Sequence, residues 1–130
     1  MNEKMSSDTN AVNWFEIPAI DISRAKKFYE NIFEIKMEEM EMPGMKYAMF
    51  PFDPMKAKVA GGLAQSPMHT PSSTGSIIYL NANPDLQKVL DRIEKAGGKI
   101  TMPKTSIGQN GFMAFFTDSE GNSMALHSNT

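Results

Sequence analysis

The sequence contains no cysteine, which excludes disulfide bonds, thiolate nucleophiles and thiolate metal ligands. Histidine is also scarce, and the two histidines, His69 and His127, are too few for a multi-histidine metal site within one subunit. The chain has no excess of positive charge, since 13 Lys and Arg stand against 15 Asp and Glu. A nucleic-acid partner is therefore not expected, because no basic surface is available for a phosphate backbone.

Long apolar runs are missing as well. No segment approaches the roughly 20 apolar residues of a membrane-spanning helix, and the first residues contain no apolar signal segment. We therefore expect a soluble cytoplasmic protein with no membrane partner, and the absence of cysteine suits that reducing compartment. At 130 residues the chain amounts to one domain with its own core. Most of its 12 methionines are expected to fill that core.

The pattern that remains indicates two similar halves. Residues 111–128 predict a β-hairpin, with strand-forming runs on either side of a polar turn at 118–122. Its first strand, 112–116, has an echo at 46–50, where Ala, a large apolar residue and Phe follow in the same order. Each half also predicts one helix from apolar residues at helical spacing: Ile22, Ala25, Phe28, Tyr29 and Ile32 in the first half, and Leu86, Val89, Leu90 and Ile93 in the second.

Both halves therefore predict the order β-α-β-β-β. Asp21 or Ser23 is the expected N-cap of the first helix, and Asn83 that of the second, with Pro84 in its first turn. The predicted boundaries are a flexible N-terminal tail at 1–10, a first module at 11–64, a linker rich in Pro, Ser and Thr at 65–75 and a second module at 76–128, all within one domain.

Three segments in this order resemble motifs of the vicinal oxygen chelate superfamily, the group that contains glyoxalase I, bleomycin-resistance proteins and extradiol dioxygenases. They are Asp21-x-x-Arg24-Ala25-x-x-Phe28-Tyr29, Lys95-Ala96-Gly97-Gly98-Lys99 and Met113-Ala114-Phe115-Phe116-x-Asp118-x-Glu120-Gly121-Asn122. The similarity spans roughly residues 11–128. It implies a glyoxalase-like α+β fold in which two β-α-β-β-β modules form curled mixed sheets around a cavity, often completed in a homodimer.

The positions at which metal-using members of that superfamily carry ligands hold no ligand in this sequence. By the resemblance, the first-strand positions fall on Trp14 and Ile78, the last on Ala125, and the remaining one near 61–63. Indole, alkyl and glycine side chains offer no lone pair suited to a divalent cation. We therefore expect no metal site of the family type and no cofactor.

Alternation along the strands then selects candidate ligand-binding residues. Trp14 and Glu16 share one face of the first strand, and Ala125 and His127 share one face of the last. Because Trp14 and Ala125 occupy ligand positions, both rows are expected to face the cavity. Ile78 joins them there. Tyr79, on the opposite face of its strand, is expected to pack under a helix.

Glu16 is the candidate catalytic or ligand-binding carboxylate, because a carboxylate in a partly dry cavity must be paired or shifted in pKa. His127 is its candidate proton partner. Simpler roles stay open: a structural ion pair or solvent contact for Glu16, core packing for Trp14, and an exposed strand end for His127. A lone loop histidine is usually solvated, so His69 receives no role, and Glu120 is assigned with its neighbours to a hairpin turn.

These observations favour a small-molecule-binding protein of the superfamily, a homodimer that holds an aromatic or cationic organic ligand without a metal. The alternative is a lyase or isomerase related to glyoxalase I that acts on a small organic substrate, either through Glu16 or with a metal in an unusual place. A third hypothesis is an interaction module that docks through the Met-rich strand at 35–42.

Overall fold

The order of secondary-structure elements repeats once along the chain. The computed structural model describes residues 3–56 and 58–130. Its elements are β1 (Trp14–Pro18), α1 (Ile22–Phe33), β2 (Glu38–Met42), β3 (Met45–Met49), β4 (Ala60–Gln65), β5 (Tyr79–Asn81), α2 (Leu86–Ala96), β6 (Lys99–Ser106), β7 (Phe112–Thr117) and β8 (Ser123–Ser128), with short 3₁₀ turns at Pro54–Lys56 and Gly108–Asn110. The predicted succession of β-α-β-β-β in each half is confirmed.

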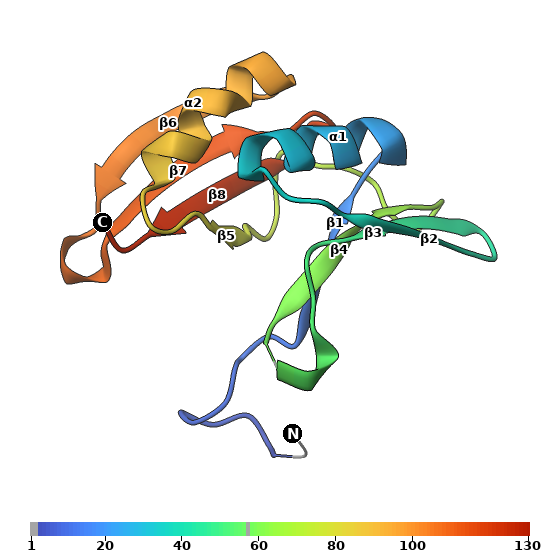
Figure 1. Cartoon of the computed structure of the whole chain (residues 1–130), viewed down its shortest axis with the longest axis horizontal. Helices are drawn as coiled ribbons and strands as arrows, with labels where there is room; N and C mark the ends of the chain where they lie inside the picture. Colours follow the sequence, from blue (N-terminus) through green and yellow to red (C-terminus); the bar gives the residue numbers. More distant parts are fainter. Residues whose placement is uncertain (1–2, 57) are drawn as a thin grey trace.

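Each module forms its own four-stranded mixed sheet (Figure 1). Sheet A has the strand order β1-β4-β3-β2, and sheet B has the equivalent order β5-β8-β7-β6. In both sheets the first and last strands of the module run parallel, and the remaining neighbours run antiparallel. This arrangement is the α+β architecture expected from the sequence.

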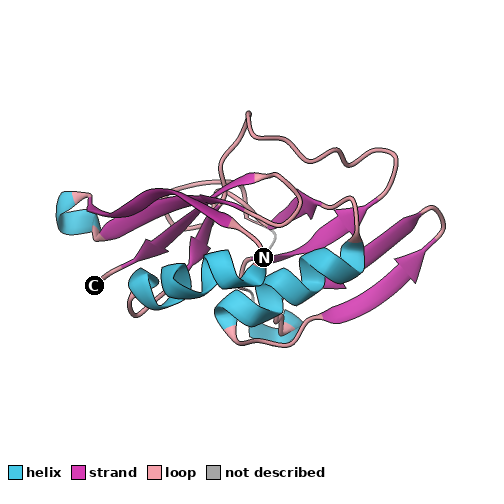
Figure 2. Cartoon of the chain, turned by 90° about the horizontal axis from the view of Figure 1, so that it is seen from above, coloured by secondary structure: helices cyan, strands magenta, loops and turns pink. Residues whose placement is uncertain are grey.

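The two helices cover one face of the sheets and lie side by side (Figure 2). Helix α1 begins at Asp21, whose Oδ1 accepts the Arg24 amide at 3.1 Å, and ends at Glu34 in a left-handed conformation with φ 55°. The apolar stripes of both helices meet the inner sides of the strands in one continuous core. We call the sheet face opposite the helices the open face.

The start of the second helix differs from the sequence prediction. Its N-cap is Asp85, which accepts the Gln87 amide at 2.9 Å, and Asn83 and Pro84 both precede the helix. An Asp side chain is as good an N-cap acceptor as Asn, so the composition alone did not distinguish the two. The second module consequently has one more residue between strand and helix than the first.

That extra residue changes which strand positions correspond in the two modules. The Ala82 amide donates to the His127 carbonyl at 2.8 Å, just as the Ala19 amide donates to the Ala64 carbonyl at 2.9 Å. Counting back from these bonds, Ile77 corresponds to Trp14 and Tyr79 corresponds to Glu16. Counting from the helix caps, as the sequence prediction did, gives an answer wrong by one residue.

Strand β6 is the longest strand of the described chain and continues from Lys99 through Pro103 to Ser106. Its pairing with β7 is irregular between Ile100 and Thr105, so the strand passes the proline through a bulged stretch. Within the described residues, neither helix is long and apolar enough to cross a membrane.

Candidate functional site

The open face of sheet A presents two rows of side chains. Residues paired across strands share a face, and the register aligns Glu16 with Gly62 and Met49, and Pro18 with Ala64, Tyr47 and Met40. The helix side of the same sheet is occupied by buried Ile17 and Leu63. Glu16 alternates with Ile17 and therefore points away from helix α1.

An aromatic cluster stands beside this carboxylate. Trp14 Nε1 donates to the Tyr47 hydroxyl at 2.7 Å, and the Phe52 ring meets the indole edge-to-face with centroids 5.3 Å apart. The Tyr47 ring lies directly over Gly62, where a Cβ would overlap it, so the paired glycines admit a ring close to the backbone. Burial, and then the Glu16 charge, raise the pKa of Tyr47. Its hydroxyl thus stays protonated near neutral pH.

The partner of Glu16 is His69, which the sequence analysis left without a role. His69 Nε2 lies 2.7 Å from Glu16 Oε1, and the imidazole is 18% exposed rather than solvated. Ser66 Oγ lies 2.7 Å from His69 Nδ1 and also accepts the Met68 amide at 3.0 Å. The expectation of a solvated His69 is therefore wrong. Ser66 and His69 are three residues apart in a turn, and this spacing is a local signal that indicates the hydrogen bond between their side chains.

Glu16 also borders a small cavity of about 170 Å³ under the linker. Its walls come from the end of β1, from the linker and from the start of β8. Hydroxyl groups are frequent in these walls, which include Thr70, Ser72, Thr74, Ser76 and Ser123. The carboxylate therefore lies between an open sheet face and a small polar recess.

The sequence suggested that Glu16 pairs with His127, but the structure does not form this pair. His127 lies on β8 in sheet B, and its Nε2 donates to the Asn110 carbonyl at 2.7 Å. The two residues belong to different sheets, and each has its own partner. The proposed proton exchange between them has no support in the geometry.

The open face of sheet B is formed around Tyr79. Its ring meets Phe115 with centroids 6.0 Å apart, and the register aligns both with Ala125. Tyr79 is 50% exposed, so the expectation that it packs under a helix is wrong. Ile78 instead packs against the core. The reason is the extra residue before helix α2, which shifted the predicted alternation by one position.

The predicted ligand positions carry no metal donors in the structure. Trp14 bonds to Tyr47, Ala125 is fully buried between neighbouring strands, and Ile78 offers an alkyl chain. Among residues 3–56 and 58–130, no three His, Asp or Glu side chains gather as a metal site. The donor set on the open faces therefore does not fit the divalent cation of the family type.

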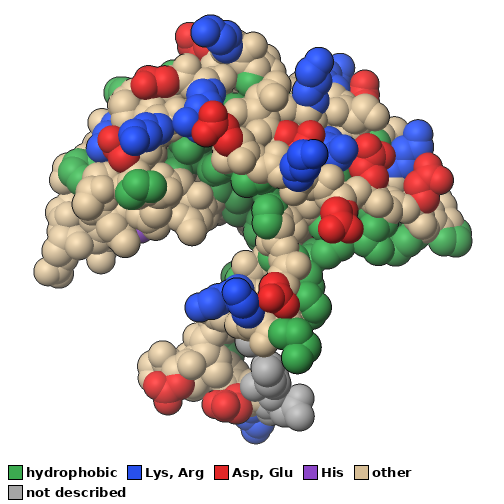
Figure 3. Space-filling model, in the orientation of Figure 1, with side chains coloured by type: hydrophobic (Ala, Val, Ile, Leu, Met, Phe, Trp, Pro, Cys, Tyr) green, Lys and Arg blue, Asp and Glu red, His purple; other side chains and the backbone are tan. Residues whose placement is uncertain are grey.

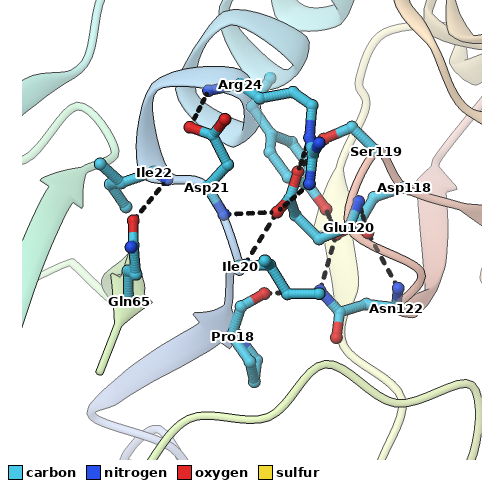
Figure 4. Close-up of polar contacts among 11 residues, drawn as sticks. Pro18, Ile20, Asp21, Ile22, Arg24, Gln65, Asp118, Ser119, Glu120 and Asn122 are labelled. Carbon is cyan, nitrogen blue, oxygen red and sulfur yellow. Dashed lines mark hydrogen bonds and ion pairs between the residues drawn. The ribbon is translucent and has the colours of Figure 1, made fainter. Parts of the chain in front are cut away.

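A second polar network joins the modules on the helix side (Figure 4). The Glu120 carboxylate accepts the amides of Ile20 and Asp21, both at 2.8 Å, and pairs with Arg24 at 2.7 Å. Burial alone raises the pKa of Glu120, but the hydrogen bonds from Arg24 and the backbone amides outweigh it and hold that pKa below its usual value. Sequence reasoning assigned Glu120 only to a turn, because a contact 100 residues away leaves no local pattern.

Asp118 and Asn122 complete this network. Asp118 Oδ1 accepts the amides of Glu120 and Asn122 at 2.9 Å, which confirms its predicted role in the turn. Asp118 Oδ2 accepts the buried Tyr29 hydroxyl at 2.7 Å, and Asn122 Nδ2 donates to the Pro18 carbonyl at 2.7 Å. These contacts connect the two modules, and two of the residues involved, Pro18 and Asn122, also line the small cavity that Glu16 borders.

An apolar groove of about 710 Å³ separates the edge strands β1 and β5. Figure 3 shows hydrophobic side chains on the hollowed underside of the molecule. The most exposed apolar residues of the groove are Val12, Val59, Ile77 and Tyr79. Exposed apolar area of this extent on a soluble domain commonly marks a binding or association surface.

The comparison with known families agrees with this architecture. The sequence profile of the Glyoxalase/Bleomycin resistance protein/Dioxygenase superfamily matches residues 11–126. The chain belongs to this superfamily. Members of the superfamily bind small-molecule ligands and often form dimers.

Sequence relatives within the superfamily have different lengths. A glyoxylase-like domain-containing protein of Didymella fabae is 31% identical over 129 residues, which cover 88% of this chain and 91% of that protein. The protein CFP32 of Mycobacterium bovis is 29% identical over 116 residues, covering 88% of this chain and 44% of CFP32. The chain thus spans about half the length of the first curated relatives that it matches.

Solved structures of superfamily members share the fold. A glyoxalase I mutant from Zea mays superposes with a TM-score of 0.69 at 24% identity, over 88% of this chain and 44% of that chain. A glyoxalase/bleomycin resistance protein from Albidiferax ferrireducens superposes with a TM-score of 0.66 at 15% identity, over 93% and 100% of the two chains. The two-module superfamily fold is therefore shown.

Proposed function

We propose that the protein binds a small organic molecule, aromatic or cationic, on the open face of sheet A. The observation that carries the proposal is the placement of the Glu16 carboxylate on the same face as Trp14 and Tyr47, with Phe52 beside the indole. Aromatic faces attract cations, and a nearby carboxylate adds a direct charge interaction. Such a set of groups recognises a ring, an organic ammonium group, or both.

Binding in this proposal uses no metal. The open faces supply ring surfaces, thioethers, the carboxylates of Glu16 and Glu38 and the imidazoles of His69 and His127, and among the described residues no three such groups gather as a metal site. The methionines at 40 and 49 share the face of Glu16 and provide apolar surface that adapts to different ligand shapes. The lyase or isomerase alternative keeps Glu16 as its candidate base, and the imidazole beside that carboxylate is His69 rather than His127.

The proposed assembly is a homodimer in which a second copy covers the open faces. Three large apolar residues on these faces stay exposed in the single chain: Met40 at 44%, Met42 at 40% and Tyr79 at 50%. The groove between β1 and β5 adds further apolar surface. A second copy that places its sheet B opposite sheet A would bury both faces and close the site around Glu16.

Trp14 is the only tryptophan, so its fluorescence reports on the site directly. The test is a titration with phenyltrimethylammonium, an aromatic cation, and with tert-butylbenzene, a neutral compound of the same shape. We expect saturable changes in Trp14 fluorescence and tighter binding of the cation. Glu16→Gln should weaken the cation about fivefold and leave the neutral compound unchanged. Glu94→Gln, an exposed helix position, is the matched control.

An unchanged affinity of the Glu16→Gln variant for the cation would contradict the proposal. The absence of any saturable Trp14 signal with either compound would also contradict it, since both fit a site built from rings and a carboxylate.

A further inference from the structure

His69 reaches the proposed site from outside both sheets. It belongs to the linker at 65–75, and its imidazole meets Glu16 on β1 at 2.7 Å. The Glu16 side chain is 40% exposed, so solvent alone would leave several rotamers open to it. His69 is the partner at 2.7 Å, and the Tyr47 hydroxyl lies near enough to Glu16 that the carboxylate raises the pKa of that tyrosine.

The direction of the hydrogen bonds follows from the chemistry of the acceptor. An ionised carboxylate has no proton to give, so His69 Nε2 must carry the hydrogen in this contact. In the neutral imidazole Nδ1 is then a lone-pair acceptor, and Ser66 donates its hydroxyl hydrogen to it across 2.7 Å. Ser66 Oγ in turn accepts the Met68 amide at 3.0 Å. The hydrogen bonds therefore point in one direction, from the Met68 amide through Ser66 and His69 to the Glu16 carboxylate.

The Glu16 side chain stays 40% exposed while His69 holds Oε1, so the carboxylate is accessible to a ligand. Oε1 is occupied by His69, and within the described residues no ion pair other than the one with His69 involves Glu16. The groups that face His69 are Glu16 from β1 and Ser66 from the linker, while Lys46, Glu41 and Glu120 line the larger cavity of about 790 Å³ on its other side. In the described chain none of these three residues hydrogen-bonds to the imidazole.

We infer that His69 is a positioning residue: through the Ser66–His69–Glu16 chain, the linker holds the Glu16 carboxylate in the orientation that selects a cationic ligand. This inference rests on the proposed function, because it gives His69 a role only through Glu16. Because His69 orients the Glu16 side chain before the ligand arrives, the side chain loses less rotamer entropy when a cation binds. The linker, which connects the modules, therefore also sets ligand preference.

The first test compares variants at position 69 that differ in their ability to donate. His69→Gln keeps an N–H that reaches a carboxylate, and His69→Phe keeps a ring but no donor. We expect His69→Phe to weaken phenyltrimethylammonium about threefold or more, and His69→Gln to stay within about twofold of the parent protein. Binding of tert-butylbenzene should be the same in all three proteins, since it makes no use of the carboxylate.

Two controls separate positioning from a general effect on the linker. Ser73→Ala changes an exposed linker residue that does not line the cavity beside Glu16, and it should leave the affinity for the cation unchanged. The second control is the tautomer of His69, read from the nitrogen spectrum of the imidazole in alkaline buffer, at about pH 9. With two histidines in the chain, the His127→Gln variant assigns the signals.

A proton on Nε2 of His69 and selective loss of the cation in His69→Phe support the inference. A proton on Nδ1, or a His69→Phe protein that binds the cation as the parent does while Glu16→Gln does not, overturns it and leaves the proposed function standing. If instead Glu16→Gln binds the cation normally, the proposed function fails, and a proton on Nε2 still supports the Glu16–His69 contact on its own.

Discussion

Arg24 of the first module and Glu120 of the second form an ion pair that connects the two modules. Arg24 Nε lies 2.7 Å from Glu120 Oε2, and Arg24 Nη2 lies 3.0 Å from Oε1, so the guanidinium meets the carboxylate with two parallel hydrogen bonds. The carboxylate is fully buried, whereas the arginine is half exposed. This ion pair links helix α1 of the first module to the turn that precedes β8 in the second module.

Glu120→Gln should destabilise the protein by about 1–3 kcal/mol near neutral pH. Glutamine keeps an oxygen for the amides of Ile20 and Asp21 but loses the charge that pairs with Arg24. The measurement is urea unfolding followed by circular dichroism. Glu94→Gln on the exposed side of α2 serves as the control, and equal stability losses in both variants would contradict a special role for Glu120.

The effect of Glu120 should also disappear in acid. The pKa of Glu120 in the folded protein lies below its usual value, so on acidification the unfolded chain binds a proton first. The stabilisation is therefore fully present above about pH 4.3, the ordinary glutamate value, and is lost as the pH falls through the folded pKa. Unfolding free energies of the parent protein and Glu120→Gln should converge in that range, and a constant difference down to about pH 2 would contradict this account.

Tyr29→Phe should cost about 1–3 kcal/mol in unfolding free energy, because it leaves the buried Asp118 carboxylate with one donor fewer. Tyr79→Phe is the matched control, since the Tyr79 ring is half exposed and its hydroxyl contacts only the Met113 sulfur, at 3.9 Å. Thermal unfolding by calorimetry measures both. If Tyr79→Phe loses as much stability as Tyr29→Phe, the hydrogen bond between Tyr29 and Asp118 is not the cause of the loss.

Tyr29 should also make the protein sensitive to base. Burial, and then the charge of Asp118, raise the pKa of Tyr29 well above its usual value. A raised folded pKa gives stability that is complete below the ordinary tyrosine pKa of about 10 and is lost as the pH rises beyond it. The parent protein should therefore lose more stability than Tyr29→Phe between about pH 9 and 11, as measured by urea unfolding.

Zn²⁺ and Ni²⁺ should neither bind stoichiometrically nor raise the melting temperature. The positions that the family uses for ligands hold Trp14, Ile77 and Ala125 once the strands are aligned by their hydrogen bonds, and these side chains do not coordinate either ion. Metal analysis after dialysis, a thermal shift with added metal, and an assay of methylglyoxal–glutathione turnover check the prediction. One equivalent of bound metal together with turnover would contradict it and favour a lyase.

Light scattering at micromolar concentration should show a dimer. Met42→Lys and Tyr79→Glu place charges on the exposed open faces and should weaken the dimer at least about tenfold. Met55→Lys is the matched control, because Met55 is 90% exposed on the short turn at Pro54–Lys56 and belongs to neither sheet. A monomer across the whole concentration range would contradict the proposed assembly.

The elements that the sequence predicted well are those with a local signal. The apolar stripe of each helix and the alternation in β1 determine which face is buried, and both were placed correctly. The site was predicted less completely. Glu16 and Trp14 were placed on the correct face, but His69 was missed, since its contact spans 53 residues and depends on how the linker folds back.

The error at Ile78 and Tyr79 shows where a local pattern fails. A strand of period two gives the wrong face to every residue when the count is wrong by one, and the count here was made from the helix caps although the second module has one residue more between strand and cap. The pairing of Tyr79 with Ala125 and Phe115 gives the correct face, because the sheet register relates the strand directly to its neighbours.

By itself the sequence determined the repeated β-α-β-β-β order, the core faces of its helices and the absence of metal-binding side chains at the family's ligand positions. These properties depend on residue type and on spacing of a few positions. Tertiary structure alone decided that Glu16 meets His69, that Glu120 meets Arg24 and that Tyr79 lies on an open face. Those contacts join residues far apart in the chain, and their partners are chosen by strand register and by the path of the linker rather than by any local preference.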